Sequence, residues 1–195
     1  MQVLVLASGS PHRAAMLRRL NLPFSQMSPG TDETAGPDEL PRALAGRLAR
    51  DKALAVRDAR LWNEPVVIIG SDQVAALGTA RLRKPGSEDR ARAQLARMSG
   101  QTVHFFTALC LVDIATGREF SALDTTIVRL RRLSDAEIDQ YIAIEQPLDC
   151  AGSFKVESLG ISLFDAVDSQ DPTALVGLPL ISLCHGLRKF GIAIP

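Results

Sequence analysis

The chain has 195 residues and a mass of 21.0 kDa, which is long enough to bury a substantial hydrophobic core. Hydrophobic residues make up 46% of it and charged residues 23%, a balance that excludes a long disordered region. The 22 basic and 22 acidic residues cancel, so the chain lacks the global positive charge that binds nucleic acid nonspecifically. We expect a single domain over residues 1–195 that binds any anionic ligand through a local cluster of charges.

Three features bear on the cellular compartment. Cys110, Cys150 and Cys184 are far apart and lack a metal-binding spacing, which favours buried thiols in a reducing environment. No apolar stretch approaches the roughly 20 residues that span a bilayer. The apolar N-terminal residues lack the basic segment of a signal peptide. We expect a cytoplasmic protein with no membrane or nucleic-acid partner.

The first predicted element is a strand over residues 3–6, whose continuous apolar run is typical of burial on both faces. Ser10 and Pro11 can begin a helix that continues to about Leu20. In residues 8–13, the backbone N–H groups at this helix N-terminus, two hydroxyl groups and one guanidinium could bind a phosphate. By itself such a turn is more often a simple helix cap, and it is not a Walker loop.

A polar segment over residues 28–37 carries Asp32 and Glu33 and leads into a long amphipathic helical pattern on which Lys52 lies. A second buried strand is predicted over residues 66–70. Asp72 follows it directly, and ligands of open α/β sheets bind at such strand ends. There an aspartate can act as a general base toward water or bind a divalent ion, and the alternative is a turn-forming residue.

The charged residues of these loops suit phosphoryl chemistry if the loops share one rim. Glu33 and Asp72 would then hold Mg²⁺ or Mn²⁺. Arg13, Lys52 and Lys84 would bind a triphosphate. Taken singly, each lysine is more often a solvated surface charge, and Glu33 a loop charge.

The remaining elements combine helices with a long hairpin. Strands are predicted over residues 102–113 and 119–131, and the Ala-Thr-Gly between them favours antiparallel pairing. Ser87 caps a helix before the hairpin, and a capping box at Ser134 begins another after it. A last helix begins near Pro179. The pattern predicts an α/β fold with a mixed sheet.

A glycine-bearing stretch over residues 149–160 is the third candidate for chemistry. At strand spacing, Lys155 and Glu157 would face one pocket. Alternatively, Phe154 belongs to the core and the two charged residues form an exposed strand face. His104 and His185 lie in apolar-periodic segments, and no carboxylate or cysteine pairing near them suggests a proton relay or a metal site, so we assign them no role.

Seven short motifs follow one another along the chain. They are LASGSPHR at residues 6–13, DET at 32–34, KA at 52–53, IGSDQV at 69–74, KP at 84–85, CAGSFK at 150–155 and GLPL at 177–180. In this order they resemble the Maf family over nearly the whole chain. One such motif would be a weak signal, whereas all of them in order are specific.

The resemblance implies a house-cleaning nucleoside triphosphate pyrophosphatase that uses a divalent cation, Mg²⁺ or Mn²⁺, to release pyrophosphate and a nucleoside monophosphate. It implies an elongated mixed sheet with flanking helices, shared with inosine triphosphatases, an active-site cleft between two lobes, and a homodimer. By position, Asp72 matches the family's proton acceptor. Its polar cleft is matched by Ser8, Ser10, Arg13, Glu33, Lys52 and Lys84.

Within the family, SDQ at residues 71–73 and FKVE at residues 154–157 resemble the branch that hydrolyses 7-methyl-GTP. The branch that acts on dTTP and UTP usually has Asp-Thr after the strand and a glutamine near the position of Glu157. The 7-methylguanine ring is cationic and carries N–H donors, which suits a carboxylate acceptor at Glu157. We therefore predict that His12, Gln73 and Glu157 select the base.

One position departs from both branches. His12 stands where the 7-methyl-GTP branch has tryptophan and the pyrimidine branch arginine, so it offers a smaller stacking surface than tryptophan. The prediction is a 7-methyl-GTP pyrophosphatase whose preference is broadened or moved. The alternatives are a dTTP and UTP pyrophosphatase of the same family, and a nucleotide-binding regulator of cell division that lacks turnover.

Overall fold

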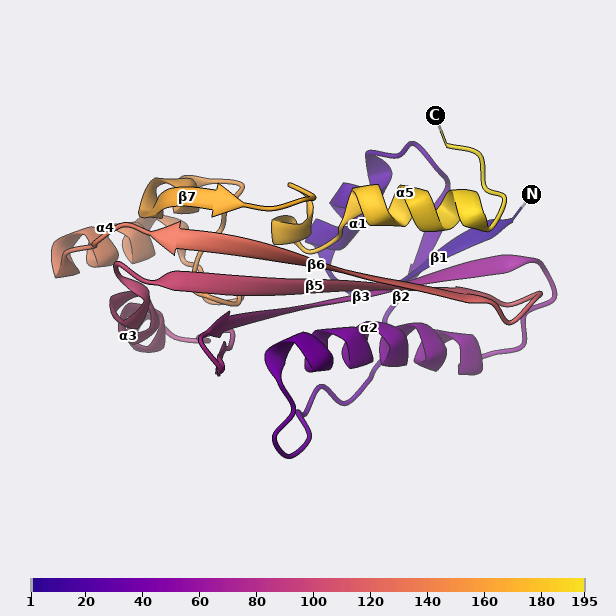
Figure 1. Cartoon of the computed structure of the whole chain (residues 1–195), viewed down its shortest axis with the longest axis horizontal. Helices are drawn as coiled ribbons and strands as arrows, with labels where there is room; N and C mark the ends of the chain where they lie inside the picture. The colour runs from indigo at the N-terminus through magenta and orange to yellow at the C-terminus, as the bar shows by residue number, and fades with distance from the viewer. Residues whose placement is uncertain (1, 195) are drawn as a thin grey trace.

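The chain folds around one elongated mixed β-sheet with helices on both faces, as the computed structural model of residues 2–194 shows (Figure 1). The strands lie in the order β2-β1-β3-β5-β6-β7, and β4 pairs with β3. Their bounds are β1 Val3–Ala7, β2 Phe24–Met27, β3 Val66–Leu77, β4 Ala80–Leu82, β5 Thr102–Asp113, β6 Glu119–Leu130 and β7 Phe164–Asp168. The β1–β2 and β1–β3 pairs are parallel and the others antiparallel, so the predicted mixed α/β sheet is confirmed.

The helices cover different parts of the sheet. In Figure 1, α2 lies on one face and α1 with α5 on the other, at the end where both termini lie, whereas α3 and α4 lie at the opposite end. Their bounds are α1 Pro11–Arg18, α2 Pro41–Asp58, α3 Glu88–Met98, α4 Asp135–Glu145 and α5 Leu180–Lys189, with the 3₁₀ turns η1 Leu159–Leu163 and η2 Ala174–Val176. None of the helices in the described part of the chain is long and apolar enough to cross a membrane.

The predicted helix starts are confirmed where side chains cap them. Ser10 Oγ accepts from Arg13 N at 3.4 Å at the start of α1, and Ser87 does the same for α3. Ser134 and Glu137 form the capping box of α4. The last helix starts at the residue after Pro179. These caps satisfy backbone N–H groups that have no partner inside their own helices.

The predicted second strand is too short, and this error misplaces Asp72. The structure continues β3 through Leu77, so Asp72 lies in the middle of a strand and not at its end. The polar residues 71–73 interrupt the apolar run without ending the strand, because β5 pairs with β3 from Val67 to Ala76. The strand spacing considered for Lys155 and Glu157 is wrong, because residues 149–158 form turns and irregular segments that lead into η1.

The open edge of β3 explains why a mid-strand residue can reach a ligand. On this edge the pairing of β3 with β1 ends at Gly70, opposite Ala7, and its pairing with β4 starts at Ala75, opposite Leu82. Residues 71–74 between these pairs have β5 on one side and no strand on the other. Side chains from both faces of β3 can therefore reach one cleft at this gap.

Hydrophobic clusters fill both faces of the sheet. One lies between the sheet and α2, a second packs α1 and α5 against the opposite face, and a third joins α3 and α4 to the far end of β5 and β6. All three cysteines are free, but only Cys110 is buried, so the expectation of buried thiols is wrong for Cys150 and Cys184. Cys150 lies on the cleft lining, which keeps it half-exposed.

Candidate active site

Two adjoining cavities open beside the unpaired edge of β3. The first has a volume of about 600 Å³ and the second about 390 Å³. Their linings contain every residue that the sequence singled out for the site except Lys155, and seven lining residues belong to both cavities: Ser10, His12, Arg13, Glu33, Lys52, Lys84 and Asp149. Asp72, Gln73 and Glu157 line only the first cavity, and Ser8 lines only the second. The loops that carry these residues therefore do share one rim.

A lysine between two carboxylates forms the centre of the site. Lys52 Nζ lies 2.6 Å from Asp72 Oδ1 and 2.6 Å from Glu33 Oε1. Lys52 and Asp72 are each only 6% exposed, so both charges are buried and depend on each other. Lys52 reaches Asp72 because α2 lies unusually close to β3. A Cβ on Gly70 would stand 2.1 Å from the carbonyl oxygen of Ala49, so only glycine fits at this crossing.

The environment shifts the pKa of the two carboxyl groups in opposite directions. Burial raises the pKa of Asp72, and the positive charges of Lys52 and Arg13 only partly oppose it. Burial works in the same sense on Glu33, but the hydrogen bond and charge of Lys52 lower its pKa. Burial thus makes Asp72 a better proton acceptor than an exposed aspartate, which is the property a general base requires.

The loop before α1 and the segment around η2 hold Arg13 beside this pair. Arg13 Nε donates to the carbonyl oxygen of Gly177 at 2.9 Å, and its Nη1 donates to Ser8 Oγ at 3.4 Å. Ser8 Oγ also accepts from Ser10 N at 3.1 Å. Burial lowers the pKa of Arg13, and the charges of Asp72 and Glu33 oppose this effect. The guanidinium is thus fixed close to both carboxylates.

His12 and Glu157 lie far apart in the sequence and meet at the first cavity. His12 Nδ1 lies 3.0 Å from Glu157 Oε1, and the two side chains are 43% and 40% exposed. Lys155 does not join them, because its Nζ donates to the carbonyl oxygen of Glu145 at 2.8 Å. Phe154 is 5% exposed and packs in the cluster under α3 and α4, as the core interpretation of this stretch predicts.

The sequence interpretation missed two polar residues of this region. Asp149 lines both cavities, and the charges of Lys155 and Lys84 help to lower its pKa against the effect of burial. Its place directly before the CAGSFK motif was the available signal. Thr107 is fully buried beside Gln73 in the pairing of β3 with β5. Nothing in the pattern of β5 distinguishes Thr107 from a core residue.

The fold and the cleft define a member of the Maf family. Residues 3–190 match the model of that family, described as Maf-like protein, and the chain belongs to it. It is 54% identical over 194 residues to the 7-methyl-GTP pyrophosphatase of Xanthomonas axonopodis pv. citri, with 98% of each chain covered. It is 53% identical over 191 residues to the 7-methyl-GTP pyrophosphatase of Polaromonas sp., with 98% of this chain and 86% of the relative covered.

Solved structures show a more distant likeness. The Ham1 protein of Staphylococcus aureus aligns with 96% of this chain and 100% of its own, with a TM-score of 0.47 and 11% identity.

Proposed function

We propose that the protein hydrolyses 7-methyl-GTP to 7-methyl-GMP and pyrophosphate in this cleft. The observation that carries the proposal is the buried Asp72, which shares one cavity with the cations of Arg13 and Lys52 and with the carboxylate of Glu157. The relatives named 7-methyl-GTP pyrophosphatase, which are more than half identical over nearly the whole chain, support the choice of substrate.

Cations and backbone N–H groups would hold the triphosphate around the N-terminus of α1. Arg13 and Lys84 line both cavities, and Ser8 and Ser10 lie at the helix start, where N–H groups favour an anion. Lys52 joins both cavities as well. The triphosphate can therefore extend from Asp72 into the second cavity and stay close to the positive charges of Arg13, Lys52 and Lys84.

Glu33 and Asp72 are the residues that would hold a divalent cation. The described residues contain no group of three or more His, Cys, Asp or Glu side chains that could bind a metal on its own. Two carboxylates fit the role nonetheless, because Mg²⁺ in nucleotide sites is commonly bound by one or two carboxylates together with substrate phosphates. When bound, such an ion supplies charge neutralisation at the phosphates.

Asp72 would activate the attacking water. It takes a proton from the water as the water oxygen forms a bond to the α-phosphorus, and the bond from that phosphorus to the β-bridging oxygen breaks. Pyrophosphate leaves with the electron pair of that bond, and Arg13 and Lys84 stabilise its charge. Lys52 Nζ contacts Asp72 Oδ1 at 2.6 Å, and its positive charge favours the ionised carboxylate that accepts the proton.

His12, Gln73 and Glu157 would select the base at the far end of the first cavity. The carboxylate of Glu157 accepts hydrogen bonds and attracts the positive charge of 7-methylguanine. His12 supplies a planar ring at the cavity wall. The His12–Glu157 contact must open or shift when a base enters, because both partners line the cavity that would receive it.

Hydrolysis of a panel of nucleotides tests the proposal. The purified protein is incubated with 7-methyl-GTP, GTP, dTTP and UTP, with Mg²⁺ or Mn²⁺ and after chelation of metals, and the products are separated. We expect 7-methyl-GMP and pyrophosphate with the highest kcat/KM for 7-methyl-GTP, and loss of turnover after chelation. A preference for dTTP and UTP would contradict the substrate, and tight binding without turnover under every metal would contradict the activity.

A further inference from the structure

The side-chain amide of Gln73 is held through its nitrogen. Gln73 Nε2 donates to the carbonyl oxygens of Ala174 and Leu175 at 2.9 and 3.0 Å, and to Thr107 Oγ1 at 3.0 Å. A carbonyl oxygen can only accept, so the amide nitrogen and not the amide oxygen must face η2. The two N–H hydrogens are shared among these three acceptors, so Oε1 is the polar atom of Gln73 that is left to serve a ligand.

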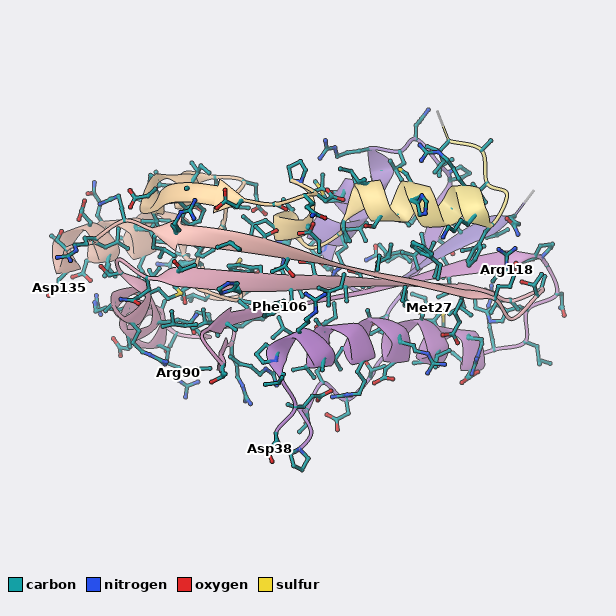
Figure 2. The ribbon with its side chains drawn as sticks, in the orientation of Figure 1. Met27, Asp38, Arg90, Phe106, Arg118 and Asp135 are labelled. Atoms are coloured by element: carbon teal, nitrogen blue, oxygen red, sulfur yellow. The ribbon has the colours of Figure 1, made fainter. Side chains whose placement is uncertain are left out.

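Thr107 also favours this orientation of the Gln73 amide. It stands directly opposite Gln73 in the antiparallel pairing of β3 and β5, one residue from Phe106, which Figure 2 labels near the middle of the long strands. Its hydroxyl group is fully buried and donates to the carbonyl oxygen of Ala174 at 2.9 Å. The single hydroxyl proton is thereby used, and Thr107 is left as an acceptor toward Gln73. A flipped amide would place its oxygen against two carbonyl oxygens that can only accept, and Thr107 could donate to it only by giving up its own bond to Ala174.

The carbonyl groups that hold Gln73 lie on a segment that is itself fixed. Asp171 is 2% exposed, and its carboxylate accepts from the backbone and hydroxyl of Thr173 and from Ile181 N at the start of α5. Asp171 N in turn donates to Asp124 on β6 at 3.2 Å. The segment from Asp171 to α5 is therefore tied to β6 and to α5, and cannot rotate its carbonyl groups away from Gln73 without breaking buried bonds.

We propose that Thr107 is a positioning residue which, with the carbonyl groups of Ala174 and Leu175, fixes Gln73 so that it offers the base cavity a hydrogen-bond acceptor and no donor. Gln73 lines that cavity together with Glu157, whose carboxylate also only accepts. The Watson–Crick edge of 7-methylguanine carries two kinds of donor, N1–H and the exocyclic amino group. The site thus selects a base edge rich in donors. This inference rests on the function proposed above.

The fixed amide is tested first without any substrate, by nuclear magnetic resonance. The side-chain N–H signals of Gln73 are assigned by their loss in Gln73→Leu, and the exposed Gln140 serves as the internal control. We expect the Gln73 protons to exchange with solvent about tenfold more slowly than those of Gln140, since a hydrogen bond worth about 1.4 kcal/mol gives that factor. Thr107→Val is expected to remove part of this protection. Equal exchange of Gln73 and Gln140 in the unmodified protein would overturn the proposal.

Kinetics with two analogues then test which donor of the base Gln73 Oε1 binds. 7-Methyl-ITP lacks the amino donor, and 1,7-dimethyl-GTP lacks the N1–H donor. We expect at least one of them to lose about fivefold in kcat/KM relative to 7-methyl-GTP, mainly through KM. Thr107→Val should reduce this discrimination and Thr107→Ser, which keeps the hydroxyl, should retain it.

Two results would overturn the acceptor assignment: both analogues hydrolysed as well as 7-methyl-GTP, or full discrimination kept by a folded Thr107→Val variant. Turnover of UTP in place of 7-methyl-GTP would instead contradict the proposed function, and the exchange rates of Gln73 would still decide its orientation.

Discussion

The two sides of the cleft are built differently. On the phosphate side, which we define as residues 8–11 and 13 with Glu33, Lys52 and Asp72, the Lys52–Asp72 pair is buried, and Lys52 also contacts the more exposed Glu33. On the base side, defined as residues 149–157 with His12 and Gln73, both partners of the His12–Glu157 contact are about two-fifths exposed. Buried ion pairs tolerate little change, whereas an exposed pair is worth little to stability. Substrate choice can therefore change in this fold without disturbing the reaction.

Asp72→Asn tests the phosphate side most severely. The substitution keeps the shape of the side chain and removes the proton acceptor, so we expect turnover of every nucleotide to fall by about 10²- to 10⁴-fold. Binding of 7-methyl-GTP, followed by equilibrium dialysis, should be largely kept. Unchanged turnover would rule out Asp72 as the base.

Gly70→Ala tests the close approach of α2 to β3. The added methyl group would meet the carbonyl oxygen of Ala49, so we expect a loss of about 1–3 kcal/mol in the free energy of unfolding, measured by urea titration. Gly46→Ala, on the α2 helix that approaches β3, is the matched control. A Cβ there has no neighbour within 4 Å, and alanine should stabilise α2 by about 1 kcal/mol. Equal effects of the two changes would contradict the packing described here.

Glu157→Gln tests the base side alone. Removing the charge weakens the attraction for the cationic ring, so kcat/KM for 7-methyl-GTP should fall about tenfold, as expected when a charged hydrogen bond becomes a neutral one. The value for UTP should remain within about twofold, because the phosphate side is untouched. A parallel fall for both nucleotides would show that Glu157 does not act on the base.

Thr31→Val is expected to stabilise the protein. Thr31 Oγ1 lies buried with no hydrogen-bond partner among the described residues, and valine has nearly the same shape without the hydroxyl group. The midpoint of urea unfolding should rise by the equivalent of about 1 kcal/mol. A lower midpoint would mean that the hydroxyl group makes a bond in solution.

Glu137→Gln gives the smallest effect and depends on pH. The capping-box bonds to Ser134, together with Arg131, lower the pKa of Glu137 to about 2 from its ordinary 4.5. A carboxyl group with a lowered pKa adds stability above its unfolded pKa and loses it as the pH falls toward the folded value. The wild-type protein should therefore have the higher Tm at neutral pH, and this advantage should vanish near pH 2. An advantage that persists there would contradict the capping role.

The difference between predictable and unpredictable features follows from how far apart the contributing residues lie in the chain. The capped helices and the hairpin of β5 and β6 depend on residues close in sequence, and these were predicted near their true bounds. The full length of β3 was not predictable from residues 66–77 alone. Its polar centre is stable as a strand because β5 supplies hydrogen-bond partners from more than 30 residues away.

The residues that line the cleft were predictable from the order of the family motifs. The contacts between their side chains were not. Lys52 looks like an ordinary helix lysine in sequence, and only the glycine crossing at Gly70 brings it to Asp72. Thr107 belongs to no sequence motif, so its proximity to the site emerges only from the pairing of β5 with β3. The expected homodimer stays a prediction.

The position at which water attacks tests the central claim most directly. The protein hydrolyses 7-methyl-GTP in water enriched in ¹⁸O, and the masses of the products are measured by mass spectrometry. Attack at the α-phosphorus, activated by Asp72, predicts one ¹⁸O atom in 7-methyl-GMP and none in pyrophosphate. Label in pyrophosphate, or release of labelled inorganic phosphate, would contradict the account.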